Sequence, residues 1–91
     1  MKNKKIAVLI SGTGSNLKAI INASKNGKIP AEVCLVISNN PNALGIRHAE
    51  DNNILYYIIN HKDYNSRREF ELQIELALDS QEIDLICLAG F

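Results

Sequence analysis

A strand, a glycine loop and a helix follow one another near the start of the chain, and this order constrains the fold more than any other feature. Lys5 to Ser11 is an apolar run of β-forming residues that leads into Ser-Gly-Thr-Gly-Ser-Asn at 11–16. A helical pattern follows at once, with Leu17, Ile20 and Ile21 on one face. The first amides of a helix lack internal acceptors and lie at the positive end of its dipole, so this order favours an anion site.

The rest of the chain continues to alternate strands and helices. Asn26-Gly27 is a stop signal for the first helix, and Ser66 with Glu69 has the spacing of a capping box, in which each side chain accepts from the other residue's amide. Gly45 falls inside the second predicted helix, where glycine costs about 1 kcal/mol relative to alanine. The predicted strands are Lys5–Ser11, Glu32–Ser38, Ile54–Ile59 and Asp84–Ala89, and the predicted helices are 15–25, 43–52 and one from 66 whose apolar face is Phe70, Ile74, Ala77 and Leu78.

The predicted fold class is α/β, a Rossmann-like doubly wound parallel sheet. The order β-α-β-α-β-α-β with right-handed crossovers gives the strand order 3-2-1-4, with helices on both faces. The first and fourth strands then lie side by side at the topological switch point, so the glycine loop and Gly90-Phe91 are expected to face one crevice. The last strand has a free edge and no following helix to cover it, so we expect residues 1–91 to be one incomplete domain.

Composition limits the partners and the compartment. Ten basic and ten acidic residues give a formal net charge of zero, which does not suit nucleic acid or an anionic membrane, so any anion must be bound locally. No apolar run approaches the roughly 18 to 20 residues of a membrane span, and we expect a cytoplasmic protein. Cys34 and Cys87 lie in apolar strand-like segments and are predicted to be core residues, roughly 10 Å apart and too far for a disulfide.

The glycine loop does not match the two commonest nucleotide motifs. Leu17 stands where a dinucleotide fingerprint needs a small residue, and Ser38-Asn39-Asn40 stands where it needs an acidic residue for the ribose. No lysine lies between Gly12 and Asn16, as a Walker loop would require. A metal-free site for one phosphate fits better, although the glycines could also serve only a tight turn.

In such a site the backbone amides would hold the phosphate. The amides of Thr13 to Asn16 would point at its oxygens, Ser15 would add a hydroxyl, and the Asn16 carboxamide would face an attached sugar. Helix N-capping is the alternative role for Ser15 and Asn16, since both residue types cap well.

Four stretches of the sequence resemble phosphoribosylglycinamide formyltransferase. They are Val8 to Leu17, Ile37-Ser38-Asn39, Ser66-Arg67 and Asp84 to Phe91. The resemblance spans essentially the whole chain and corresponds to the amino-terminal half of that family's domain. It implies transfer of a formyl group from 10-formyltetrahydrofolate to the amino group of glycinamide ribonucleotide, a step of purine synthesis. Sister formyltransferases that act on methionyl-tRNA or hydrolyse formyltetrahydrofolate do not normally carry this Gly-Ser-Asn arrangement.

The resemblance also implies roles for individual residues of the glycine loop. Gly14, Ser15 and Asn16 match the family's contacts to the phosphoribosyl part of the substrate, and Gly12 and Thr13 shape the loop. The five residues together form the expected substrate-binding site.

A second group of residues matches the family's cofactor contacts. Arg67 corresponds to an arginine that contacts the folate, and Gly90 and Phe91 correspond to the entry of the segment that holds the pterin. The alternative for Arg67 is a solvated first-turn arginine beside Glu69, because charged residues at helix starts usually face water.

The chain contains no expected catalytic residue and no expected metal ligand. The resemblance implies a catalytic asparagine, histidine and aspartate, all beyond Phe91, so we expect the 91-residue chain alone to be inactive. His48 is predicted to be a helix-surface residue and His61 a loop residue. Asp63 and Asp84 lack a visible acid-base partner.

Two other functions remain open at this point. A small phosphate-ligand binding module would need a stable, folded 91-residue chain. A nicotinamide-dependent oxidoreductase of Rossmann type is disfavoured by Leu17 and by the missing ribose acid.

Overall fold

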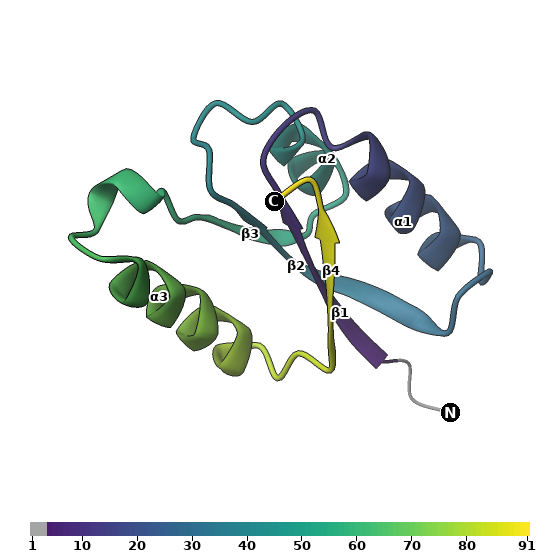
Figure 1. Cartoon of the computed structure of the whole chain (residues 1–91). Helices are drawn as coiled ribbons and strands as arrows, with labels where there is room; N and C mark the ends of the chain where they lie inside the picture. Colours follow the sequence, from purple (N-terminus) through teal and green to yellow (C-terminus); the bar gives the residue numbers. More distant parts are fainter. Residues whose placement is uncertain (1–3) are drawn as a thin grey trace.

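A parallel four-stranded sheet in the order β3-β2-β1-β4 forms the centre of the molecule (Figure 1). The computed structural model describes residues 4–91. The predicted α/β class, strand order and parallel pairing are confirmed. The elements are β1 (Lys4–Ile10), α1 (Ser15–Lys25), β2 (Ala31–Ser38), α2 (Ile46–Asp51), β3 (Leu55–Ile58), the 3-10 turn η1 (His61–Asp63), α3 (Arg67–Ser80) and β4 (Leu85–Ala89).

Helices cover the sheet on both faces, with α1 and α2 on one side and α3 on the other (Figure 1). Strand β1 is buried from Ile6 to Ile10 and sends alternate side chains to the two faces. Val8 and Ile10 pack with Leu17 of α1, while Ala7 and Leu9 pack on the face of α3. Because β1 contributes to both cores, its carboxyl end and the loop that follows are fixed from two sides.

Helix α2 is shorter than predicted, because Gly45 precedes it instead of lying within it. The helix begins at Ile46, with Gly45 as its N-cap. A Cβ on Gly45 would lie 2.7 Å from Cδ1 of Ile10 and 2.9 Å from the Cα of Gly14. The predicted helix over 43–52 was therefore too long at both ends. Gly45 lies outside the helix, where its lack of a side chain allows close contact with Ile10 and Gly14.

The predicted capping box at the start of α3 is present, with one different partner. The Ser66 hydroxyl accepts from the amide of Glu69 at 3.2 Å. The Glu69 carboxylate accepts from the amide of Asn65 at 3.3 Å, one residue before the predicted one. The cap satisfies the amide of Glu69, one of the first amides of the helix, so α3 begins at a defined residue.

Both cysteines are free, as predicted, and half-buried. Cys87 packs against the core on the side of α1, whereas the thiol of Cys34 donates to the carbonyl of Glu32 at 3.5 Å. Burial, helped by the nearby charge of Glu32, raises the pKa of the Cys34 thiol. The expectation of two core cysteines therefore holds better for Cys87 than for Cys34.

Strand β4 is the least covered part of the sheet. It pairs with β1 on one side, and the described chain offers no strand to its other edge. Leu85, Ile86 and Leu88 all remain exposed, as expected for an apolar strand without a covering helix. Within residues 4–91, no helix is both long and apolar enough to span a bilayer.

Replacing Gly14 by alanine should destabilise the fold by about 2–5 kcal/mol, because a Cβ there would lie 2.6 Å from the Cα of Gly45 and the backbone has φ +75°. Gly27→Ala is the matched control, since Gly27 has φ +71° but open space around it, and it should cost only about 1–2 kcal/mol. Urea unfolding measures both values. Equal losses would mean that the contact with Gly45 contributes nothing.

Candidate functional site

The glycine loop joins β1 to α1 and ends in a left-handed residue. Gly14 is the N-cap of α1, and no side chain of residues 4–91 caps this helix, so the capping role considered for Ser15 and Asn16 is wrong. The side chains of Thr13, Ser15 and Asn16 are exposed. The first turn of α1 contains no acidic residue. Its first amides therefore lie at the positive end of the helix, where an anion would meet no competing carboxylate from the first turn.

A turn after β2 holds this loop in place. The Asn40 carboxamide donates to the carbonyl of Ser11 at 3.2 Å, and the amide of Gly45 donates to the carbonyl of Gly12 at 3.0 Å. The turn is itself tied by Ser38, whose hydroxyl accepts from the Asn40 amide at 3.1 Å. In the sequence, Asn39 and Asn40 were noted only because they stand where a dinucleotide fingerprint needs an acidic residue, although asparagine often bonds neighbouring backbone in this way.

His48 is a packing residue as well as a helix-surface residue. It is half-buried, and its Cδ2 would lie 3.2 Å from a Cβ on Gly14. Thr13, Arg47 and His48 line a cavity of about 540 Å³ together with apolar residues that include Pro41, Ala43, Leu44 and Ile46. This cavity extends from the loop to α2, and its wall is part polar and part apolar.

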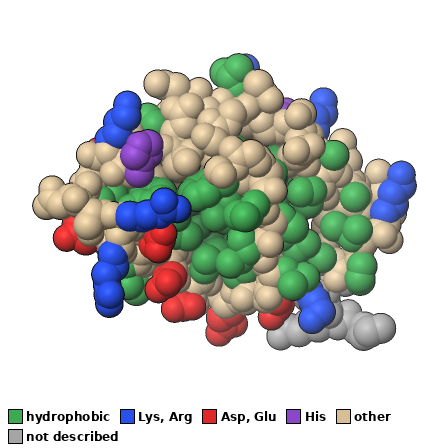
Figure 2. All heavy atoms as spheres, in the orientation of Figure 1, with side chains coloured by type: hydrophobic (Ala, Val, Ile, Leu, Met, Phe, Trp, Pro, Cys, Tyr) green, Lys and Arg blue, Asp and Glu red, His purple; other side chains and the backbone are tan. Residues whose placement is uncertain are grey.

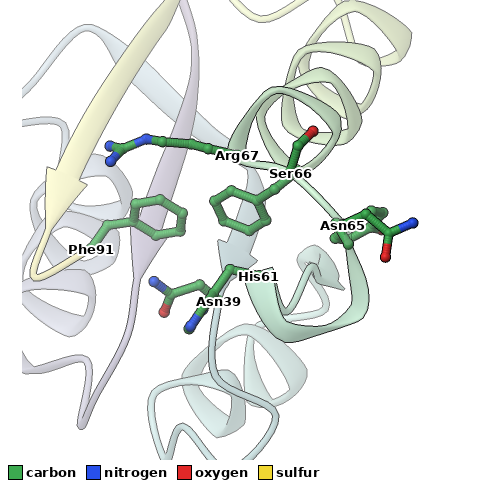
Figure 3. Close-up of a pocket in the computed structure, with 8 residues that line it drawn as sticks. Asn39, His61, Asn65, Ser66, Arg67 and Phe91 are labelled. Atoms are coloured by element: carbon green, nitrogen blue, oxygen red, sulfur yellow. The ribbon is translucent and has the colours of Figure 1, made fainter.

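A separate cavity of about 440 Å³ lies between the ends of β2 and β4 and the start of α3 (Figure 3). Figure 3 shows Arg67 reaching across its opening on the side of Phe91, with Asn39 and His61 opposite and the Asn65 side chain pointing away. The full lining is Asn39, His61, Tyr64, Asn65, Ser66, Arg67, Phe70 and Phe91. We call this the aromatic cavity.

Phe70 is the centre of the aromatic cavity. Its ring lies parallel to that of Phe91, with centroids 6.3 Å apart, and edge-on to His61 at 6.1 Å. Tyr64 approaches the same ring at 6.2 Å. A pocket with several aromatic walls binds flat conjugated rings by stacking and apolar contact.

Arg67 is solvated, as the alternative interpretation of this residue expected. Its guanidinium is paired with Glu71 at 2.9 Å, and 90% of the side chain is exposed. An exposed pair of this kind contributes roughly 0–1 kcal/mol. The arginine can therefore exchange Glu71 for a ligand carboxylate at small cost.

A third cavity, of about 370 Å³, adjoins the aromatic cavity and shares Asn39 and His61 with it. Within the part of the chain that the structure describes, the two linings include Arg67 and Lys62 and no aspartate or glutamate, a charge distribution that favours an anionic ligand. The Asn39 Oδ1 atom is buried and accepts no hydrogen bond within residues 4–91. An unsatisfied acceptor costs about 1–3 kcal/mol, so a donor at Asn39 would stabilise this edge.

The structure brings together some of the predicted site residues. Arg67 and Phe91 line one cavity, and Gly90 bridges to Ile10, directly before the glycine loop. The loop residues do not line the aromatic cavity, so the expected single crevice consists of two neighbouring surfaces along one edge of the sheet. The described residues hold no group of three or more metal-ligating side chains. Asn39, His61, Tyr64 and Phe70 also line this cavity but were not predicted from the sequence, because they lie in separate segments of the chain.

Comparison with known proteins identifies the family. The model of the formyl transferase family matches residues 4–91. The chain belongs to the formyl transferase family. It is 46% identical to the human trifunctional purine biosynthetic protein adenosine-3 and 43% identical to phosphoribosylglycinamide formyltransferase of Haemophilus influenzae. Glycinamide ribonucleotide transformylase 1 of Geobacillus kaustophilus superposes with a TM-score of 0.94 at 39% identity.

This formyl transferase chain is much shorter than the proteins that it matches. The alignments cover 99% of the chain but 9% of the human relative, and 97% of the chain but 42% of the H. influenzae relative. The superposition covers 98% of the chain and 47% of the G. kaustophilus structure. The structural likeness is therefore close over one part of a formyltransferase.

Replacing Arg67 by alanine should leave the free energy of unfolding within about 0.5 kcal/mol of the parent, because the ion pair with Glu71 is solvent-exposed. Ser66→Ala is the comparison and should lose about 1 kcal/mol, since its hydroxyl caps α3. Chemical denaturation of both variants gives the values. A loss at Arg67 as large as that at Ser66 would assign the arginine a structural role.

Proposed function

We propose that this chain provides the phosphoribosyl-binding part of an enzyme that transfers a formyl group from 10-formyltetrahydrofolate to glycinamide ribonucleotide in purine synthesis. A role in this pathway would place it in the cytoplasm. One observation carries the proposal. The start of α1, which follows the glycine loop and has no side-chain cap, lies at the same edge of the sheet as the aromatic cavity beside Arg67. Membership of the formyl transferase family supports the choice of reaction.

The glycine loop, from Gly12 through Thr13 and Gly14 to Ser15 and Asn16, is the proposed phosphate site. Amides at the start of α1 would donate to the phosphate oxygens, and the exposed Ser15 and Asn16 side chains would add hydrogen bonds to the phosphate and the ribose. The contacts from Asn40 and Gly45 keep the loop in one shape before the ligand arrives. Preorganisation of this kind lowers the entropy lost on binding.

The aromatic cavity, with Arg67, Gly90 and Phe91 at its side, is the proposed folate site. Phe70 and Phe91 offer apolar faces to a flat ring, and Arg67 offers a guanidinium to a carboxylate. Folate carries both kinds of group. The absence of acidic side chains from the described lining agrees with an anionic ligand.

Catalysis would need groups that this chain is not expected to provide. Attack of an amine on the formyl carbon requires stabilisation of the oxyanion and removal of a proton from the amine. We assign these tasks to the part of a formyltransferase that the chain does not cover, and no catalytic role to His48 or His61. Residues 1–91 would then be the amino-terminal, substrate-binding half of the domain, inactive by itself.

The purified chain should bind glycinamide ribonucleotide, and Asn16→Ala should weaken that binding roughly five- to tenfold, because one hydrogen bond to the ligand contributes about 1 kcal/mol. Asn22→Ala is the matched control, since Asn22 is exposed on the same helix but lies near its other end. Isothermal titration calorimetry measures both. Equal effects of the two substitutions, or no binding of the phosphate ester, would contradict the assignment of the loop.

The chain should also bind 5-formyltetrahydrofolate, used as a stable formylated folate, and Arg67→Ala should weaken it about tenfold by removing a charge-assisted hydrogen bond. Arg68→Ala is the control, because Arg68 is the exposed neighbour and lies outside the lining of the aromatic cavity. Fluorescence titration follows the affinity. Binding of the phosphate ester without any binding of folate would favour the small phosphate-binding module.

A further inference from the structure

His48 of α2 lies directly against the glycine loop. Its ring atom Cδ2 would be 3.2 Å from a Cβ on Gly14, the residue at the N-cap of α1. The loop after β1 passes beside α2 (Figure 1). Thr13 of this loop and His48 line the same cavity of about 540 Å³, so the imidazole and the proposed phosphate site share one surface.

Hydrogen bonds fix the backbone of His48. Its amide donates to the carbonyl of Gly45 at 3.0 Å, and its carbonyl accepts from the carboxamide of Asn52 at 2.7 Å. The side chain is half-buried and forms no ion pair within residues 4–91. An imidazole held in this way offers its nitrogen atoms to a ligand and has little conformational freedom left to lose on binding.

The glycine loop has no charged side chain to offer an anion. Residues 11–16 are all neutral, whereas a phosphate monoester carries between one and two negative charges near neutral pH. The charged groups around His48 are Arg47 and Glu50, which line the same cavity on α2, and Lys18, one turn along α1. All three are exposed, and solvent screens their charges. His48 is therefore the half-buried ionisable group on this surface.

Acidic side chains lie away from the glycine loop on the face drawn in Figure 2, where they gather on its lower part. The loop after β1 and helix α2 lie at the top of the molecule in the same orientation (Figure 1). On this face of the described chain, a phosphate that approaches the start of α1 therefore meets no nearby carboxylate.

Histidine changes its charge between about pH 5 and pH 8, and a bound anion favours the charged ring. We propose that His48, when charged, pairs with the phosphate that the glycine loop holds and makes the site prefer a phosphate monoester to a singly charged ester of the same sugar, such as a sulfate. The attraction grows with the charge of the anion, so a dianion gains more than a monoanion. The inference rests on the proposed function and gives His48 a role in binding, not in catalysis.

The affinity for glycinamide ribonucleotide should depend on pH in a way that His48→Gln removes. In calorimetric titrations at about pH 6, the parent chain should bind roughly five- to tenfold more tightly than His48→Gln, and at about pH 8 the two should bind alike. The phosphate of the ligand titrates in the same range for both proteins, so the ratio of the two affinities reports the imidazole. For the matched sulfate ester the ratio at about pH 6 should be only about twofold.

Two further variants separate a charge on His48 from packing. Arg47→Gln is the matched control, because Arg47 is the exposed neighbour on the same helix, and its ratio to the parent should be the same at both pH values. His48→Arg should bind tightly at both, since a guanidinium stays charged.

Proton NMR of the unmodified chain tests the inference without any substitution. The chain contains two histidines, so their imidazole signals can be followed separately. Saturating glycinamide ribonucleotide at about pH 7 should move the signals of His48 toward those of the charged ring and leave those of His61 unchanged.

Several results would overturn the inference. They are an equal loss of affinity in His48→Gln at the two pH values, unchanged His48 signals in the ligand-bound chain, and a sulfate ester that depends on His48 as strongly as the phosphate ester does. In each case Asn16→Ala separates this failure from failure of the proposed function, because weaker binding by that variant keeps the glycine-loop assignment. Absence of binding by the parent chain would remove both proposals.

Discussion

The approach of Gly14 to Gly45 is the contact on which the functional edge of this molecule depends. It places two helix starts against each other with no side chain between them, because a Cβ on Gly14 would come within 2.6 Å of the Gly45 Cα. The same contact seats Gly45 over Ile10, at the end of the central strand. Backbone contacts thus fix the glycine loop, α1 and β1 relative to one another. The side chains at the start of α1 take no part in these contacts and remain available to a ligand.

Much of the fold followed from local patterns in the sequence. The apolar run before Gly12, the glycine at 27 and the Ser66 cap each act within a few residues, and helix α1 has the predicted bounds. The parallel order of the sheet followed from the alternation of elements and the handedness of crossovers. The error at α2 arose because the role of Gly45 is set by a contact with Gly14, 31 positions away in the sequence, which no local pattern records.

The candidate site was less predictable than the fold, for the same physical reason. The glycine loop could be recognised because its five residues are consecutive. The aromatic cavity is assembled from residues after β2, around η1, at the start of α3 and after β4, and Phe70 looks in the sequence like an ordinary core position of a helix. Arg67 could be named from the sequence, whereas its ion pair with Glu71 was found only in the structure, in which Glu69 is used by the cap of α3.

The hydrogen bond from Asn40 to the carbonyl of Ser11 ties two loops that belong to different crossovers. A substitution in the turn after β2 would therefore alter the shape of the glycine loop without changing any of its residues. In an evolving family, this arrangement would make the two loops vary together. A library of substitutions over residues 39–42 would therefore be an indirect way to change ligand preference in such a domain. It would reshape the proposed anion site and leave its backbone donors intact.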